Sequence, residues 1–288
     1  MPVENASGIP EIIVYGTVCL DRFLLAGTDE VVEFPGGEAF NTATALVGWG
    51  VRVALTGTAL GSDPEADRLR HLLDTHPLGV PREYVPNLPE AVTPVCTVRV
   101  DVHGERHMSG RGFREAVAPT WESIEPLFVS RPILTIDPNL GDAATETACR
   151  AASQGCPVVA MDFVHVPEVV RTCRILVTSQ EWIARAGTGE TPEQAVHRLA
   201  ATGARTAIVT LGAAGGIVYD REAGLFTFPA VVPPRAIVDT TGAGDTFRAG
   251  LCYGLLHDLT LQETLSFAAQ VAARHCTVLG GGSRLPLP

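Results

Sequence analysis

The sequence contains no lysine, so all 21 of its basic residues are arginine. A Walker A phosphate loop, the strand lysine of protein kinases and a lysine Schiff base each need an ε-amine, and the composition excludes all three. Basic blocks are also missing, and the formal net charge is −11. This balance argues against a dedicated surface for nucleic acid or for anionic membranes. An enzyme with this composition would handle phosphate with backbone amides, arginine or a metal ion.

Other absences narrow the class of protein further. The seven cysteines include no CxxC pair, which suits reduced thiols better than a disulfide framework. The eight histidines show no HExxH or similar spacing, so we expect no zinc site. No apolar run is long enough to span a bilayer, and the first residues carry no basic segment of a signal peptide. We therefore expect a cytoplasmic protein.

Apolar runs alternate with helical segments along the chain, a pattern that favours a mostly parallel sheet covered on both faces. We expect a single domain over residues 1–288. The predicted strands are 11–18, 51–60, 132–137, 157–163, 174–179 and 205–212, and the predicted helices are 38–49, 63–75, 141–153, 180–186, 192–202 and one that ends near 276. Capping boxes begin two of these helices, at Thr191 with Gln194 and at Thr260 with Glu263.

Residues 94–110 interrupt this alternation. Their sequence, PVCTVRVDVHGERHMSG, alternates in polarity and predicts a hairpin that turns at His103–Gly104. An antiparallel hairpin within a parallel pattern is either a flap over the edge of the sheet or an ordinary extra edge hairpin. The sequence alone favours neither.

The stretch DTTGAGDTF (239–247) follows the apolar residues 236–238, which we expect to end a strand, and it precedes an amphipathic helix. The glycines then lie at a strand-to-helix junction, where unpaired amides and the helix dipole favour an anion. Gly242 and Gly244 would let the backbone approach a bulky phosphate without a Cβ in the way. The junction is a candidate phosphate site.

Asp245 stands where this helix begins, and its commonest role there would be an N-cap. A helix needs one capping residue, however, and not a whole glycine loop. An amide pocket beside a carboxylate suits phosphoryl transfer, in which the carboxylate orients an attacking hydroxyl and accepts its proton. The helix terminus should lower the pKa of Asp245, but in this step positioning matters more than basicity.

Two separate motifs resemble one family. The run DTTGAGDTFRAGL is similar to the C-terminal signature of the PfkB/ribokinase family of ATP-dependent sugar and nucleoside kinases, and PGGEAFNTATALVGWG (35–50) is similar to its Gly-Gly-x-x-x-Asn helix entrance. The elements between them also fit, so the resemblance covers nearly the whole chain. The segments VTSQEW and ETLSFAAQVAARHCTVLGG most resemble ketohexokinases and related bacterial sugar kinases. The resemblance implies a ribokinase-like three-layer α/β/α fold and the use of ATP with Mg²⁺.

On the phosphate side, the resemblance implies that Asp245 is the catalytic base. The anion hole would be formed by Gly242, Ala243 and Gly244. The resemblance also implies a nucleotide site in VTLGAAGG, although that segment alone predicts only a hairpin turn. The matching nucleotide-site residues are Thr210, Gly212 and Gly215.

On the substrate side, the matching positions are Asp21, Gly36, Gly37 and Asn41. Glu38 is a further candidate, although sugar kinases often carry asparagine or lysine at this place after the double glycine. A polyol needs partners that accept and donate hydrogen bonds together, which carboxylates and amides supply. The carboxylate of Glu38 would accept a substrate hydroxyl or repel an acidic sugar. Asp21 as a solvated residue at the end of a strand, and Asn41 as a polar residue at a helix start, remain alternatives.

The metal positions depart from the usual pattern of the family. Relatives have Asn-x-x-Glu near Mg²⁺, whereas this chain has VTSQEW, which leaves Glu181 to reach the ion through water. Asp239 and Thr241, with the loop LGGGS (279–283), match positions at which many relatives bind a monovalent cation. The resemblance therefore implies Mg²⁺ and adds K⁺ as a candidate.

The predicted lid is small. Only 14 residues separate Asp21 from Gly36, an interval that holds lid strands in typical relatives. We expect a reduced β lid formed mainly by 94–112, with a short contribution from 22–35, and either a monomer or a homodimer. Arg111 and Arg114 follow the hairpin; either they pair with a phosphate of substrate or ATP, or they are solvated, which is commoner for arginines there.

The sequence thus predicts an ATP- and Mg²⁺-dependent kinase that phosphorylates a hydroxymethyl group of a small sugar. A nucleoside kinase of the same family and a non-catalytic ligand-binding relative stay open as alternatives. A Rossmann dehydrogenase fits poorly, because GxGxxG is missing after the first strand, where the chain reads GTVCLD.

Overall fold

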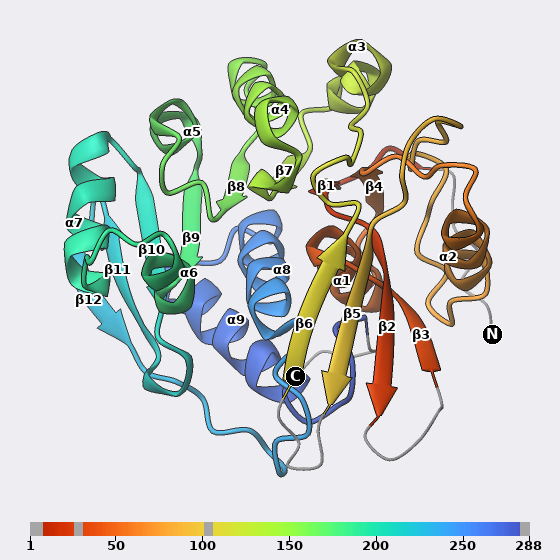
Figure 1. Ribbon diagram of the computed structural model, residues 1–288. Coiled ribbons are helices and arrows are strands. Elements are labelled where there is room, and N and C mark those ends of the chain that lie inside the picture. The colour runs from red at the N-terminus through yellow and green to blue at the C-terminus, as the bar shows by residue number, and fades with distance from the viewer. Residues whose placement is uncertain (1–7, 26–30, 101–105, 283–288) are drawn as a thin grey trace.

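The computed structural model describes residues 8–25, 31–100 and 106–282, and its larger sheet has eight strands (Figure 1). The strands lie in the order β12-β11-β10-β9-β8-β7-β1-β4. Those from β10 to β4 pair in parallel, and β11 and β12 extend the sheet antiparallel. Their bounds are β1 Ile12–Gly16, β4 Val53–Gly57, β7 Ile133–Ile136, β8 Val158–Met161, β9 Ile175–Ser179, β10 Thr206–Thr210, β11 Gly216–Asp220 and β12 Gly224–Phe228.

Helices connect these strands, and most lie within one or two residues of the predicted spans. Their bounds are α1 Glu38–Gly48, α2 Pro64–Asp74, α3 Trp121–Ile124, α4 Gly141–Ser153, α5 Pro167–Thr172, α6 Gln180–Arg185, α7 Pro192–Thr202, α8 Ala243–Leu256 and α9 Leu261–His275, with 3₁₀ turns η1 Glu125–Phe128, η2 Pro138–Leu140 and η3 Gly212–Ala214. Both predicted capping boxes, at the starts of α7 and α9, are present. None of the described helices has the length and apolar character needed to cross a membrane.

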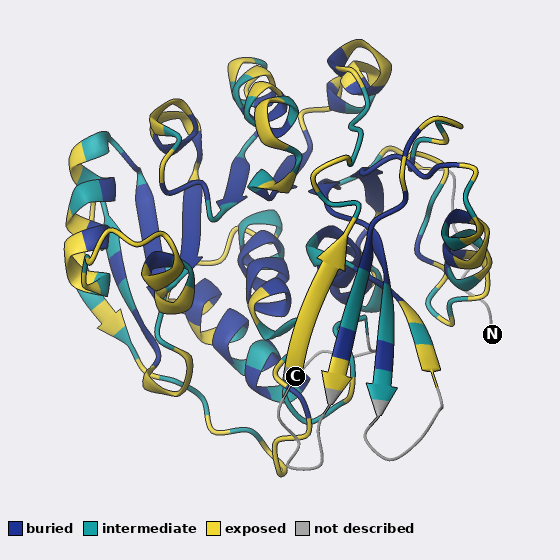
Figure 2. Ribbon diagram, in the orientation of Figure 1, coloured by how far each residue is buried: buried dark blue, intermediate teal, exposed yellow. Residues whose placement is uncertain are grey.

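The larger sheet is covered on both faces, as its fully buried first strand requires. Ile12 and Val14 point into a core shared with α1, α8 and α9. The alternate residues Ile13 and Tyr15 point into a second core, built with α3, α4 and α5. Figure 2 shows the central strands and the inner faces of these helices buried. The three-layer α/β/α architecture is therefore confirmed.

A smaller, four-stranded sheet has the order β3-β2-β5-β6. Its strands are β2 Cys19–Leu25, β3 Val31–Gly36, β5 Val95–Val100 and β6 Arg106–Arg111. The pairs β2–β3 and β5–β6 are antiparallel, and β2 pairs with β5 in parallel. The predicted hairpin strands are confirmed, whereas the predicted turn at His103–Gly104 lies outside the described residues.

The expectation of a short contribution from residues 22–35 is wrong, because two of the four strands of the smaller sheet come from Cys19–Leu25 and Val31–Gly36. The strands extend beyond the predicted interval at both ends. At about 3.3 Å per residue, a segment of this length is sufficient for a hairpin of two short strands. The predicted lid therefore corresponds to a sheet built equally from two hairpins.

No strand forms at residues 236–238, contrary to the prediction. The amides of Val238 and Asp239 both donate to the carbonyl of Cys276, at 2.8 and 3.2 Å, and not to a neighbouring strand. Pro233 and Pro234, which precede this segment, cannot donate to a sheet ladder. Helix α8 is therefore preceded by an irregular segment that is tied to the end of α9.

Candidate active site

The start of α8 places Asp245 inside the helix and not at its cap. Gly242 is the N-cap, with φ 80°, so Asp245 is the third helical residue. Gly242 is required here because of its left-handed backbone and because a Cβ would lie 2.6 Å from the Cα of Gly281. The N-cap role of Asp245 that was left open by the sequence is therefore wrong.

The amides of this turn divide into two groups. Ala243 donates its N–H to the carbonyl of Thr240, at 3.2 Å, and so closes the turn. Within the described chain, the N–H groups of Gly242, Gly244 and Asp245 donate to no acceptor. A Cβ on Gly244 would meet no atom within 4 Å, so the space on the side-chain side of this residue is open. The structure thus leaves Ala243 out of the predicted anion hole and adds the amide of Asp245.

The Asp245 carboxylate is nearly buried, with 6% of the residue exposed. Its Oδ2 accepts a hydrogen bond from Asn41 Nδ2 at 2.9 Å, across from α1. Burial raises the pKa of Asp245, while the positive charge of Arg248 and the Asn41 hydrogen bond act in the opposite direction. The prediction that the helix terminus lowers this pKa is wrong, because desolvation is the larger effect at a buried carboxyl.

Two acceptor atoms from α1 lie unpaired beside Asp245. Within the described residues, neither Asn41 Oδ1 nor Glu38 Oε2 has a hydrogen-bond partner, and both atoms are buried. Burial raises the pKa of Glu38 well above its usual value, and the nearby charges of Asp137 and Asp245 raise it further. Buried polar atoms without partners are costly, so these oxygens suit a ligand that carries several hydroxyl groups.

Asp21 lies within β2 and not at a solvated strand end. Burial raises the pKa of Asp21 to about 6; a hydrogen bond from the Cys19 thiol lowers it, and the charge of Asp245 raises it. A Cβ on Gly36 would lie 2.1 Å from Asp21 Oδ2, so only glycine fits beside this carboxylate. Gly37, with φ 94°, then starts α1. Gly36 therefore lies against the Asp21 carboxylate, and Gly37 leads directly into the helix that carries Asn41.

Two further carboxylates near Asp245 were missed by the sequence analysis. Asp137, fully buried after β7, accepts hydrogen bonds from the amides of Thr17 and Asn139, at 3.2 and 3.1 Å. Asp162, after β8, accepts from Thr178 Oγ1 at 2.6 Å, and burial raises its pKa to about 6. Each directly follows a buried parallel strand, at the edge where ligands bind in open α/β sheets. That position was the signal that could have identified them.

The predicted nucleotide segment forms the turn between β10 and β11, as the alternative reading had it. Thr210 ends β10 and donates its hydroxyl to the carbonyl of Thr178 at 3.3 Å. Gly212 and Gly215 have φ of 57° and 86°, and a Cβ on Gly215 would lie 2.0 Å from the Phe228 carbonyl oxygen. The glycines are therefore needed for the turn itself, and a nucleotide role for this segment remains a prediction.

The predicted metal ligands belong to two separate candidate sites, Glu181 for Mg²⁺ and Asp239 with Thr241 for K⁺. Within the described chain, no group of three or more His, Cys, Asp or Glu side chains is arranged to hold a metal ion. Asp239 accepts backbone N–H groups from Thr241, at 2.7 Å, and from Gly280, at 2.9 Å. The Thr241 carbonyl lies 2.7 Å from His275 Nε2. Glu181 is exposed on α6, and its role as a ligand of Mg²⁺ stays a prediction.

A model of one protein family, described as "pfkB family carbohydrate kinase", matches residues 10–288. The chain belongs to this family. The ribokinase of Arabidopsis thaliana is 24% identical over 96% of this chain and 79% of its own length. A nucleoside kinase of Methanothermobacter thermautotrophicus is 27% identical over 88% and 83%. Mouse ketohexokinase is 46% identical over 48 residues, which are 17% of this chain and 16% of that protein.

Structural comparison supports the same fold. The structure of Arabidopsis ribokinase complexed with ribose and ATP superposes with a TM-score of 0.82 at 21% identity, covering 97% of this chain and 96% of that one. Several sequence matches are local: the chain spans only 17%, 37% and 25% of three further curated relatives. The family and the fold of this chain are therefore shown.

In this family member, Arg111 does not lie beside Asp21, which counts against the alternative that it pairs with a phosphate of the substrate. In the smaller sheet Asp21 is in register with Cys96, whereas Arg111 pairs one position away, with Val95. Successive side chains of a strand point to opposite faces, so Arg111 and Asp21 lie on opposite faces of the sheet. The Arg111 guanidinium instead forms an ion pair with Glu65 of α2.

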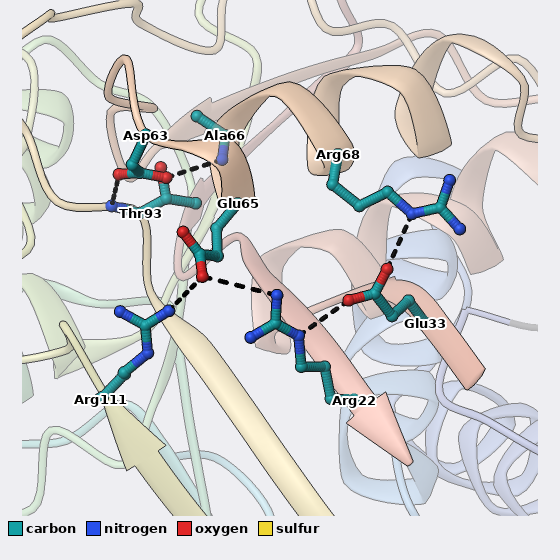
Figure 3. Close-up of polar contacts among 8 residues, drawn as sticks. All are labelled: Arg22, Glu33, Asp63, Glu65, Ala66, Arg68, Thr93 and Arg111. Carbon is teal, nitrogen blue, oxygen red and sulfur yellow. Dashed lines mark hydrogen bonds and ion pairs between the residues drawn. The ribbon is translucent and has the colours of Figure 1, made fainter. Parts of the chain in front are cut away.

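Figure 3 shows that this ion pair belongs to a chain of alternating charges between α2 and the smaller sheet. Glu65 also lies 3.5 Å from Arg22, and Arg22 binds Glu33 at 2.8 Å. Glu33 in turn accepts from Arg68 of α2 at 2.8 Å. These side chains are partly exposed, so each pair contributes at most about 1 kcal/mol to stability. The network fixes the outer face of the sheet against α2.

We expect Arg111→Ala to leave the KM values for ATP and for the acceptor within about threefold of wild type. The exposed ion pair of Arg111 contributes little to stability, and its side chain lies on the face of the smaller sheet opposite to Asp21. Steady-state kinetics with Arg68→Ala as a matched control would test this. A rise of tenfold or more in either KM for Arg111→Ala alone would return Arg111 to the substrate site.

Proposed function

We propose that this protein is an ATP- and Mg²⁺-dependent kinase that phosphorylates a hydroxymethyl group of a small sugar. One observation carries the proposal: the buried Asp245 carboxylate stands beside the unpaired amides of Gly244 and Asp245 at the start of a 14-residue helix. Unpaired amides bind the oxygens of a phosphoryl group, and a carboxylate in their immediate neighbourhood receives a proton from an attacking hydroxyl.

The transfer step follows from this geometry. The acceptor hydroxyl oxygen forms a bond to the γ-phosphorus of ATP, and the bond from that phosphorus to the bridging oxygen breaks, which releases ADP. The hydroxyl proton passes to Asp245. Asn41 holds the carboxylate by its Oδ2 atom, so the other oxygen stays available to the hydroxyl. Amides that bind the phosphoryl oxygens stabilise the charge that spreads over them in the transition state.

The acceptor would bind between the smaller sheet and α1. Asp21 would accept hydrogen bonds from hydroxyl groups on one side, and the unpaired oxygens of Glu38 and Asn41 would accept them on the other. Three oxygen acceptors within reach of one ligand suit a polyol better than an apolar molecule. The same acceptors would disfavour an acidic sugar, because its carboxylate would meet carboxylates.

ATP and Mg²⁺ fit this chain without lysine. The helix terminus and its amides would receive the terminal phosphate, and the predicted residues Thr210, Gly212 and Gly215 would line the rest of the nucleotide site. Mg²⁺ binds mainly water and substrate phosphates with one or two carboxylates, so it needs no preformed cage; Glu181 is our candidate. The ion would neutralise charge on the phosphates. K⁺ near Asp239 and Thr241, both engaged within the protein, remains a weaker proposal.

A nucleoside kinase is the second candidate, since one full-length relative carries that name. A panel of ketoses, aldoses and nucleosides, assayed for ADP release with ATP and Mg²⁺, separates the two candidates. Transfer to adenosine or inosine, with none to free sugars, would replace the sugar kinase by a nucleoside kinase. No transfer to any acceptor would favour a non-catalytic ligand-binding protein.

All seven cysteines are free thiols, which supports a cytoplasmic setting for either kinase.

The pH dependence of acceptor binding should report Asp21. Because its pKa is raised to about 6, the carboxylate is ionised above about pH 6 and becomes neutral below it. We expect the acceptor KM to rise as the pH falls through about 6. Asp21→Asn should raise this KM about 10- to 100-fold at pH 7.5, which is the loss of affinity expected when hydrogen bonds to a charged group are weakened. The same variant should remove the pH dependence of the acceptor KM.

Steady-state kinetics from pH 5 to 8 would measure both effects, with the KM for ATP as an internal reference. Asp67→Asn on the exposed face of α2 is the matched control and should change neither KM. An acceptor KM for Asp21→Asn that stays at the wild-type value would show that Asp21 does not bind the acceptor.

A further inference from the structure

Arg248 is the largest fully buried side chain among the described residues. It lies on α8, one helical turn after Asp245, and its exposed fraction is 0%. Arginine is seldom fully buried unless it is paired, because removing its charge from water is costly. Nothing in the sequence motifs assigned a role to this residue.

The guanidinium of Arg248 connects α8 to α1. Its Nε and Nη2 atoms donate to Thr42 Oγ1, at 3.1 and 2.8 Å, and Nη2 also donates to the Glu38 carbonyl at 2.8 Å. Nη1 is buried and has no hydrogen-bond partner in the part of the chain that the structure describes. Both α1 contacts come from the turn that also presents Asn41 to Asp245.

Carboxylates surround this single buried guanidinium. Asp245 Oδ1 lies 3.7 Å from Nη2. Burial raises the pKa of Asp245 and of three neighbours, and the charge of Arg248 opposes that rise in all four. The three neighbours are Glu38 on α1, Asp137 after β7 and Asp162 after β8. Asp21 on β2 also interacts with Asp245 and adds a further negative charge.

A purely structural role explains this arrangement poorly. Replacing a buried ion pair by apolar side chains of similar volume is often neutral or even stabilising. Helices α1 and α8 already pack through apolar residues such as Phe40 and Leu251, and the unfilled Nη1 donor adds a further cost. The charge of Arg248 is buried at this cost between α1 and the proposed base Asp245. This position indicates a role in the candidate active site.

We propose that Arg248 is a positioning residue for phosphoryl transfer, which holds the Asp245 carboxylate ionised and directed at the acceptor hydroxyl. This inference rests on the proposed kinase function. Arg248 offsets the surrounding negative charge, with Nη2 3.7 Å from Asp245 Oδ1, while Asn41 Nδ2 holds the Oδ2 atom. The proton of the hydroxyl still goes to Asp245; Arg248 touches neither substrate nor phosphate.

The test compares Arg248→Met and Arg248→Gln, which remove the charge, with Arg248→Lys, which keeps it. In both neutral variants kcat should fall about 10- to 100-fold, within the range of acid–base catalysis.

The acid limb of kcat, which is the fall of kcat at low pH, should move to higher pH by about one unit or more, because loss of a nearby opposite charge raises a carboxyl pKa. Measuring kcat at saturating acceptor separates this limb from the effect of Asp21, which appears in KM. Arg248→Lys should keep the limb in place and lose about three- to tenfold in kcat as the Thr42 and Glu38 contacts are weakened.

The control is Arg198→Met, which removes a partly buried arginine of α7 that binds Glu190 and the carbonyl of Val164. This variant should leave the profile unchanged. Folded Arg248→Met or Arg248→Gln with an unmoved acid limb would overturn the inference, even if the melting temperature falls. If both fail to fold, Arg248→Lys decides: an unchanged kcat would reject the positioning role, because weakened contacts to Thr42 and Glu38 should lower kcat.

The outcome can be separated from a failure of the proposed function. If the wild type transfers phosphate to no acceptor, the kinase proposal fails, and isotope-edited infrared titration then measures the carboxyl groups directly. The Asp245 band, assigned by its loss in Asp245→Asn, should titrate at higher pH in Arg248→Met than in wild type. Equal titration in the two proteins would reject the effect of Arg248 on Asp245 independently of activity.

Discussion

Asp245→Asn is expected to lower kcat about 10²- to 10⁴-fold, the usual contribution of a positioned general base, while the protein stays folded. An asparagine side chain keeps the shape and an oxygen for the bond from Asn41 Nδ2, but it cannot take the hydroxyl proton. Because the pKa of Asp245 is raised in the folded state, the ionised carboxylate costs stability above that pKa. The neutral amide removes this cost, so the melting temperature at pH 7.5 should be equal to or higher than that of wild type.

Product formation followed by ADP release and scanning calorimetry on the same preparations would test both halves of this expectation. Asp67→Asn supplies the control, since this residue lies exposed on α2 and pairs with Arg70. Retention of kcat within a factor of three in Asp245→Asn would remove the base from the mechanism, whatever its stability.

Gly244→Ala should separate stability from activity even more sharply. A Cβ at this position meets no protein atom within 4 Å, and alanine is favoured over glycine in a helix by about 0.5–1 kcal/mol. The variant should therefore fold with unchanged or higher stability. The same methyl group would stand in the open space beside the unpaired amides, where the γ-phosphate would approach. We expect kcat/KM for ATP to fall at least about 100-fold, the cost of losing contact with an oxyanion-binding amide.

Gly242→Ala is the contrasting variant from the same loop. Its positive φ of 80° and the 2.6 Å approach to Gly281 predict strain in the folded protein. It should lose both stability and activity. If Gly244→Ala keeps wild-type kcat/KM, the phosphate does not bind at these amides and the site has to be sought elsewhere on the sheet edge.

Much of the architecture was predictable because the signals for it are local. Strand and helix spans follow from hydrophobic periods of about 2 and 3.6 residues, and the capping boxes at Thr191 and Thr260 mark helix starts within four residues. The glycine loop before α8 was visible for the same reason. The prediction of a strand at 236–238 was wrong because it followed from the apolar composition alone. The preceding prolines cannot donate to a sheet ladder.

The membership of the site required contacts between distant segments. Asn41 and Asp245 are 204 positions apart, and no local pattern says that their side chains meet. Asp137 and Asp162 each read as ordinary residues after a strand until the parallel register brings both strand ends to one edge. Arg111 was a candidate for phosphate binding because it follows the hairpin in sequence, whereas the pairing of β2, β5 and β6 places it on the face of the sheet opposite to Asp21.

The sequence by itself determined which segment can receive a phosphate and which acid stands beside it, because backbone conformation at glycine and the start of a helix are properties of a few neighbouring residues. Only the tertiary structure decided how that acid behaves. Burial raises the pKa of Asp245, and the buried Arg248 opposes that rise. Desolvation and charge neighbours depend on what the whole chain packs around a group, so no stretch of sequence contains them.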